Sequence, residues 1–230
     1  MAGRAAESAI IRVFEPQDDS RILEVMMRGM SRNGIVAITL GLFILAVACT
    51  AVELPAPKVK IGDKIEDFTL PDVSGKMRSL YEFKGKKAVA VIFIATRCPY
   101  SNAFNQVMAK LAQEYGERGI AFVGINANKT EPTAEVAEHA RTHGLGFTVL
   151  KDDGNTIADR LGAHVTPEVF LMDSHWTLRY HGALGNSHDP TTKPEQATDA
   201  EVRPALESVL AGQAGTQAET KAFGCTIKRI

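Results

Sequence analysis

The sequence lacks a surplus of charge of either sign. Its 230 residues include 26 Lys and Arg against 27 Asp and Glu, which gives a formal net charge of -1. Without a basic surplus we expect no nucleic-acid partner, and no long run of like charge marks a charged binding tail. No internal repeat is present either. With 45% hydrophobic and 23% charged residues, the composition is that of an ordinary globular domain with extensions.

The six histidines lack the close spacing that metal ligands show in a sequence. They are scattered over predicted helix, loop and turn, which favours side chains that are exposed or locally hydrogen-bonded. They are His139, His143, His164, His175, His181 and His188. We therefore predict no metal site and no cofactor.

Cysteine is scarce, with Cys49, Cys98 and Cys225 alone in the chain. Cys98 follows residues 88–95, an unbroken uncharged run that predicts a strand buried on both faces, as in the centre of a parallel sheet. After Cys98 the apolar residues recur at spacings of three and four, which predicts an amphipathic helix. The apolar residues of that helix are Phe104, Val107, Met108, Leu111 and Tyr115.

Cys98 lies at the joint between this strand and this helix. Pro99 suits the first helical position, so Cys98 falls at or beside the N-cap. Free backbone N–H groups and the positive helix end favour a thiolate there, and a nearby Arg97 would add to the effect. The pattern predicts a nucleophilic sulfur. The alternative is that Cys98 is a small buried side chain, the common role of a lone cysteine.

Residues 33–52 carry no charge over twenty positions. This stretch is long enough to span a bilayer and also fits the hydrophobic region of a secretory signal. The small residues 46–48 precede Cys49 as a cleavage site does, and the segment resembles a bacterial lipoprotein signal with Cys49 as its lipidation candidate. A cleaved signal, a retained membrane anchor and a buried helix are the three alternatives.

The translation start of the leader, residues 1–32, is doubtful. A start at Met30 would give a shorter signal peptide than a start at Met1. In the first two alternatives the working domain is exported to the cell envelope or periplasm, attached to the membrane by residues 33–52 or by lipid. Residues 53–58 then form a linker, 59–212 the domain, and 213–230 a weakly structured tail that carries Cys225. Disulfides persist outside the cytoplasm.

The rest of the domain alternates strands and helices. Residues 119–126 predict a second buried strand, so the strand–helix–strand unit implies a right-handed parallel crossover. A helix over 132–143, a short strand at 148–150 and a short helix at 155–161 follow. The strands at 168–172 and 177–181 fit an antiparallel pair. Residues 186–200 are predicted as a loop, and a closing helix ends before Gly212.

This order resembles a thioredoxin fold with the N-terminal β extension of redoxins, the group of alkyl hydroperoxide reductase and thiol-specific antioxidant proteins. The fold class implied is α/β, with a central mixed sheet flanked by helices. The resemblance covers residues 59–230 and includes the Gly-Cys-x-Ile ending of envelope-associated members. The segments that carry it are 62–70, Arg97-Cys98-Pro99, 123–128, 150–152, 162–170 and Gly224-Cys225-Thr226-Ile227.

The resemblance also has departures. Thioredoxins carry Cys-x-x-Cys, and Ala95 stands at the place of the first cysteine. Related copper-delivery proteins carry Cys-Pro-x-x-Cys, and Asn102 stands where their second sulfur would be. Peroxiredoxins place a Thr where Ala95 stands, although Thr96 is adjacent. Pro167 after Thr166 matches the family's cis-proline, which lies against the active cysteine; the alternative is an ordinary trans proline that opens an edge strand.

The resemblance implies an exported thiol oxidoreductase, peroxiredoxin-like or acting on disulfides. The Cys98 thiolate attacks a peroxide oxygen or a disulfide sulfur, supported by Thr96, Arg97, Pro99, Thr166 and Pro167. A thiol reductant of unknown identity resets it. Cys225 is the candidate to resolve oxidised Cys98, because its tail is predicted to be mobile. The alternatives are a copper-binding or partner-binding module without turnover and an inert scaffold.

Overall fold

The structure is a computed structural model that describes residues 59–186, 193–213 and 218–229. The predictions for the leader, the signal or anchor, the linker and Cys49 lie outside the described residues. Within those residues, no helix has the length and apolar character needed to cross a membrane.

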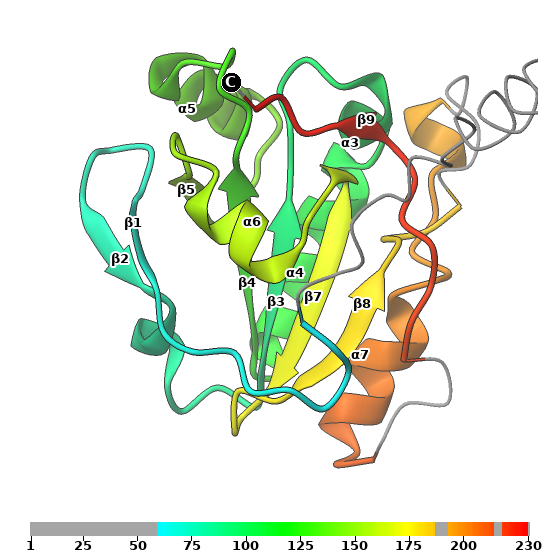
Figure 1. Cartoon of the computed structure of the whole chain (residues 1–230). Coiled ribbons are helices and arrows are strands. Elements are labelled where there is room, and N and C mark those ends of the chain that lie inside the picture. The colour runs from blue at the N-terminus through cyan, green and yellow to red at the C-terminus, as the bar shows by residue number, and fades with distance from the viewer. Residues whose placement is uncertain (1–58, 187–192, 214–217, 230) are drawn as a thin grey trace, which may run out of the picture. The chain divides into compact units, whose positions relative to one another are not determined.

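A five-stranded sheet forms the centre of the domain (Figure 1). Its order is β5 (Thr148–Lys151), β4 (Ile120–Asn126), β3 (Ala88–Phe93), β7 (Glu168–Asp173) and β8 (Leu178–Gly182). The pairs β3–β4 and β4–β5 are parallel, whereas β3–β7 and β7–β8 are antiparallel. The predicted mixed sheet, parallel crossover and antiparallel pair are confirmed.

Every residue of β3 and β4 is buried, as their unbroken apolar sequences predict. Successive side chains of a strand point to opposite faces, so alternate residues of β3 enter different cores. Ala90 and Ile92 join the cluster on one face, while Val91 and Phe93 join the cluster on the other. The strand that precedes Cys98 is therefore fixed from both sides.

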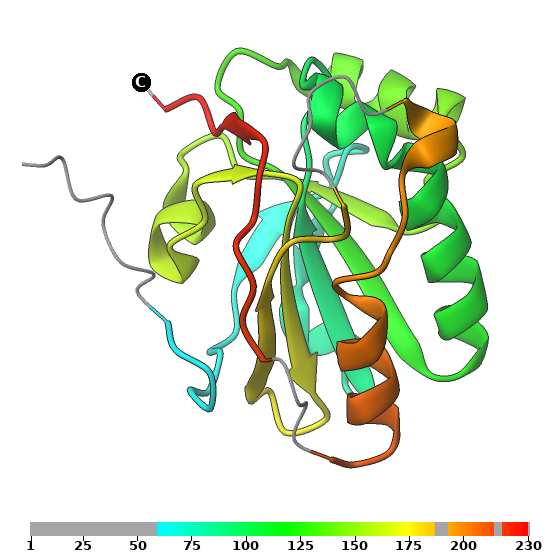
Figure 2. The same ribbon diagram turned by 90° about the vertical axis from the view of Figure 1, so that its right-hand side faces the viewer.

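Helices cover both faces of the sheet (Figure 2). One face packs against α4 (Asn105–Glu117), α5 (Thr133–Thr142) and α7 (Arg203–Leu210). The other packs against α6 (Thr156–Leu161) and the N-terminal extension. These two apolar cores make a three-layer α/β domain with the sheet in the middle.

The N-terminal β extension that the resemblance implies is a β-hairpin. Strands β1 (Thr69–Pro71) and β2 (Met77–Ser79) pair antiparallel, and a 3₁₀ helix, η1 (Leu80–Phe83), follows. Ser79 and Glu82 form a capping box that starts this helix.

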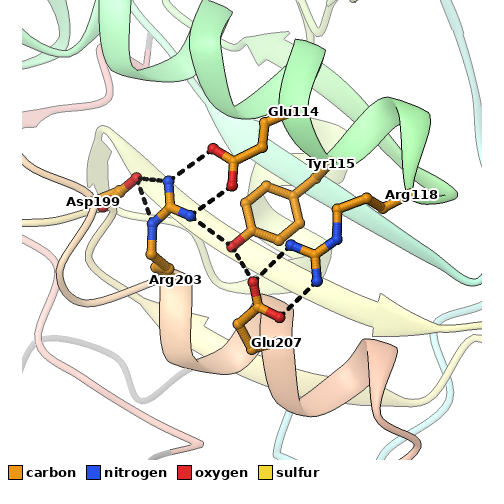
Figure 3. Close-up of polar contacts among 6 residues, drawn as sticks. All are labelled: Glu114, Tyr115, Arg118, Asp199, Arg203 and Glu207. Atoms are coloured by element: carbon orange, nitrogen blue, oxygen red, sulfur yellow. Dashed lines mark hydrogen bonds and ion pairs between the residues drawn. The ribbon is translucent and has the colours of Figure 1, made fainter.

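A polar network joins α4 to α7 at the surface (Figure 3). The Tyr115 hydroxyl donates to Glu207 Oε1 at 2.7 Å and accepts from Arg203 Nη1 at 3.0 Å. The Arg118 and Arg203 guanidinium groups each bind a carboxylate through two nitrogens. The members are Glu114, Tyr115, Arg118, Asp199, Arg203 and Glu207.

Three sequence expectations need correction. The predicted helix after Cys98 is broken at Phe104 into α3 (Pro99–Ala103) and α4. The loop over 186–200 contains a 3₁₀ turn, η2 (Pro194–Gln196). Residues 218–229 of the tail are not weakly structured, because β9 (Cys225–Thr226) pairs antiparallel with β6 (Val165–Thr166). A two-residue pairing between distant segments has too short a pattern to be read from sequence.

Candidate active site

Cys98 is the N-cap of α3, with Pro99 at the first helical position as predicted. Its Sγ accepts the Ser101 N–H at 3.4 Å, and its side chain is only 2% exposed. The Ser101 hydroxyl accepts the Ala95 N–H at 3.1 Å, so Ser101 joins the end of the strand to the first helical turn. The sulfur therefore lies at a fixed position, in contact with a backbone donor.

A buried carboxylate holds the two residues before Cys98. Glu131 accepts the backbone N–H of Thr96 at 2.9 Å and that of Arg97 at 3.0 Å. Burial raises the pKa of Glu131, but hydrogen bonds from these N–H groups and from Asn126 and Asn128 outweigh it and lower the pKa below its usual value. Glu131 thus remains an acceptor for the loop at neutral pH.

Thr96 and Arg97 direct their side chains to α5. The Arg97 guanidinium lies on the Glu135 carboxylate, with Nε 2.8 Å from Oε1, and the Thr96 hydroxyl donates to the same oxygen at 2.7 Å. The hydrogen bond from Arg97 lowers the pKa of Glu135 to about 2. Arg97 is therefore paired with a carboxylate, which neutralises its charge, and its assistance to the Cys98 thiolate stays a prediction.

The Thr166–Pro167 peptide bond is cis, as the resemblance implies. The Thr166 carbonyl oxygen lies 3.3 Å from Cys98 Sγ. Glu168 holds this turn, because its Oε2 accepts the backbone N–H groups of residues 164 and 165 at 2.8 and 3.1 Å. The cis-proline turn and the strand–helix joint thus meet at the sulfur of Cys98.

Cys225 reaches the same place through β9, where it pairs with Thr166 across the ladder. β9 lies beside α3 (Figure 1). Its thiol is close enough to Cys98 and to the Tyr100 N–H for both to act on its pKa. Burial, the hydrogen bond to Cys98 and the negative charge of the Cys98 thiolate raise the pKa of Cys225 to about 12. Both cysteines are free thiols.

A sequence profile of the AhpC/TSA family matches residues 61–181, more than half of the chain. The chain belongs to the AhpC/TSA family. The matched region contains Cys98 and Pro167 and ends before Cys225.

Relatives in this family include thiol-disulfide oxidoreductases and peroxiredoxins. The chain is 32% identical to thiol-disulfide oxidoreductase ResA of Halalkalibacterium halodurans over 116 residues, 50% of this chain and 64% of that protein. It is 29% identical to chloroplastic peroxiredoxin Q of Gentiana triflora over 129 residues, 53% of this chain and 58% of that protein. The chain thus spans less than two thirds of either relative.

A solved structure resembles the domain over more of its length. The crystal structure of a hypothetical protein from Sinorhizobium meliloti has a TM-score of 0.69 and 35% identity, and covers 75% of this chain and 96% of that one. The fold that places Cys98 is thus found in a solved relative of known architecture.

The structure brings together Cys98, Pro99, Thr166, Pro167 and Cys225 of the predicted site, and turns Thr96 and Arg97 toward α5. The sequence analysis missed two supporting residues. They are Ser101, one turn after Cys98, and Glu131, whose role depends on a contact between distant segments.

No group of three or more His, Cys, Asp or Glu side chains in the described part of the chain is placed to hold a metal ion. The candidate reactive groups of the site are the free thiols of Cys98 and Cys225, which lie on separate segments of the chain.

Proposed function

We propose that this protein is an exported thiol oxidoreductase in which Cys98 and Cys225 form the redox-active pair. The observation that carries the proposal is the ladder pair between Cys225 and Thr166, because the Thr166 carbonyl oxygen lies 3.3 Å from Cys98 Sγ. This pairing brings Cys225 to the same turn as Cys98, where it can replace the neighbouring cysteine that a Cys-x-x-Cys motif supplies. Thioredoxin-fold placement of Cys98 against a cis-proline supports the same role.

With a peroxide, the Cys98 thiolate attacks one oxygen and the O–O bond breaks. Cys98 becomes a sulfenic acid, and the leaving hydroxide or alkoxide takes a proton to become water or an alcohol. The Cys225 sulfur then attacks Cys98, and one water leaves as the disulfide forms. The peroxide is reduced by two electrons and the dithiol is oxidised by two.

With a disulfide, the Cys98 thiolate attacks one sulfur and releases the other as a thiolate. Cys225 then attacks the Cys98 sulfur of the mixed disulfide and releases the second substrate thiol. The products are a reduced substrate and an intramolecular Cys98–Cys225 disulfide. An external dithiol reductant must reduce that disulfide in either reaction.

Export rests on residues 33–52, which precede the described domain. An uncharged stretch of this length followed by a small-residue cleavage pattern supports a signal or anchor, and Cys49 as a lipid attachment site. The envelope is a compartment in which a protein disulfide persists between catalytic cycles.

Stopped-flow mixing of the reduced protein with hydrogen peroxide and, separately, with a small aromatic disulfide tests the proposal. We expect at least one reagent to react rapidly with Cys98, and the faster one defines the reaction class. Cys98→Ser is the control and should abolish the fast phase. A fast phase that persists in Cys98→Ser, or none with either reagent, contradicts the proposal.

The adjacent thiols also support a second candidate, a Cu(I)-binding module without turnover. Two thiolates are suitable soft ligands for Cu(I). Titration of the reduced protein with Cu(I) should then show tight one-to-one binding that is lost in Cys98→Ser. Such binding together with no thiol reaction would favour this candidate over the enzyme.

A further inference from the structure

The C-terminal segment 218–229, here called the strap, runs beside the edge strand β8 and across the site (Figure 2). Before Cys225, the strap binds β8 through the backbone: the His181 N–H donates to Ala218 O at 3.0 Å, and the Thr220 N–H donates to His181 O at 3.0 Å. The Thr220 hydroxyl contacts the Tyr180 hydroxyl at 2.7 Å and the Ala183 N–H at 2.9 Å.

After Cys225, the strap is held by a second set of contacts. Ile227 is 2% exposed in the core next to α6, and its N–H donates to His164 O at 2.9 Å. The Lys228 N–H donates to Asn128 Oδ1 at 2.7 Å, and Arg229 Nε donates to Asp159 Oδ1 at 2.8 Å. Cys225 therefore lies between two anchored ends.

Gly224 lets the strap lie directly against the cis-proline turn. A Cβ at this position would lie 1.9 Å from Thr166 O and 2.6 Å from Thr166 C, so no other residue fits without moving the strap. The strap thus occupies the backbone edge of β6 beside Cys98.

Two consequences follow for access to Cys98. A second polypeptide that binds by strand addition beside Cys98 needs a free strand edge to lie along, and β9 already occupies the edge at β6. A small molecule needs no strand edge; it needs only an opening of its own size at Cys98, which is 2% exposed and lies beside the half-buried Cys225.

We propose that the strap sorts electrophiles by size, so that with the strap in place Cys98 reacts with small peroxides and small disulfides but not with polypeptide disulfides. This inference rests on the proposed function. Polypeptide disulfides react only in the fraction of molecules whose strap has lifted, so their apparent rate is reduced by that fraction. Loosening the strap raises that rate and leaves the small-molecule rate unchanged.

The experiment uses the full chain with Cys225→Ser as the background. Cys225 can no longer release the mixed disulfide, so a single attack by Cys98 is trapped and counted by mass spectrometry. The two probes are dithiodipyridine, a small disulfide, and insulin, a polypeptide with disulfides. The loosening variants are Thr220→Val and Gly224→Ala.

Each loosening variant has a matched control. Thr226→Val makes the same substitution at an exposed position of the strap, and Gly116→Ala adds a Cβ where nothing lies within 4 Å. We expect the insulin rate to rise about tenfold in Thr220→Val, since two hydrogen bonds are lost, and to stay unchanged in both controls. If Gly224→Ala fails to fold, Thr220→Val still decides.

In all variants the dithiodipyridine rate should stay within about twofold of the rate in the Cys225→Ser background. A twofold change is smaller than the effect expected from the loss of one typical hydrogen bond. Equal insulin rates in the background and the loosened variants overturn the strap inference while dithiodipyridine still reacts. A parallel rise of both rates overturns it too, because the strap would then exclude every electrophile. No reaction of Cys98 with either probe in any variant overturns the proposed function itself.

Discussion

The two cysteines differ at the scale of single residues in a way that suits their proposed roles. Cys98 is buried and accepts a backbone N–H, whereas Cys225 has a pKa raised to about 12 and keeps its proton. Cys98 Sγ also lies 3.3 Å from the Thr166 carbonyl oxygen. In the proposed reaction Cys98 attacks first and the protonated Cys225 follows.

The pKa of Cys225 should fall when Cys98 is replaced. In Cys98→Ser the hydrogen bond to the thiol and the charge of the thiolate are gone, and burial alone keeps the value above that of a free cysteine. The pH dependence of alkylation by iodoacetamide, followed by mass spectrometry at Cys225, measures this. A pKa of Cys225 unchanged from wild type would show that the thiols do not interact.

Glu131 should stabilise the fold in a pH-dependent way. Its folded pKa is lowered, so its contribution is present above the usual glutamate pKa and is lost as the pH falls through the folded value. Glu131→Gln should cost about 1–3 kcal/mol of unfolding free energy at neutral pH, since one acceptor oxygen is replaced by an amide donor.

Urea unfolding of wild type and Glu131→Gln at neutral and acidic pH makes the measurement. The difference between the two proteins should shrink as the pH drops. Glu117→Gln, at an exposed position near the end of α4, is the control and should be neutral at both pH values. If the difference in unfolding free energy between wild type and Glu131→Gln does not change with pH, the Glu131 carboxylate does not stabilise the fold in this way.

At the scale of elements, the network between α4 and α7 closes one face of the sheet. Tyr115 is central to it, because its ring is buried and its hydroxyl contacts Glu207 and Arg203 (Figure 3). Burial and the hydrogen bond to Glu207 raise the pKa of Tyr115 to about 12. A raised pKa of this kind stabilises the fold below the unfolded value of about 10 and is lost as the pH rises through the folded one.

Tyr115→Phe should lower the unfolding free energy by about 1–2 kcal/mol at neutral pH, because two hydrogen bonds are lost. The variant should also lose less stability than wild type on going to strongly alkaline pH. Urea unfolding at both pH values tests this. Tyr81→Phe is the control, since its hydroxyl makes one long 3.4 Å contact. Equal alkaline losses in wild type and Tyr115→Phe would contradict the assignment.

The elements also show what the sequence can predict. The buried strands, the strand–helix joint at Cys98 and the antiparallel β7–β8 pair follow from local period and turn residues, and the cis bond at Pro167 follows from the family resemblance. The Arg97–Glu135 pair and the β6–β9 pair join residues far apart in the chain. Local propensity carries no signal for such pairings, so the ordered strap and the partner of Arg97 required the structure.

At the scale of the whole molecule, a Cys98–Cys225 disulfide would close a loop of more than a hundred residues. In the simple chain-entropy model such a bond stabilises the folded state by about 5 kcal/mol. Because the pairing of Cys225 with Thr166 already brings both cysteines to one turn, the folded protein needs little rearrangement to form it. The oxidised protein should therefore unfold at higher temperature than the reduced one.

Thermal unfolding of oxidised and reduced samples measures the effect, with Cys225→Ser put through the same oxidation as the control. The variant should show no rise in its midpoint. An oxidised wild type that melts at the same or a lower temperature than the reduced form would mean that the bond strains the fold or does not form.

The most direct test is peptide mapping of reduced protein treated with one equivalent of hydrogen peroxide or of a small disulfide. We predict a Cys98–Cys225 crosslink within monomers. Stable sulfenate, over-oxidation or a lasting mixed disulfide at Cys98, with Cys225 still free, would contradict the account, as would a crosslink between two chains.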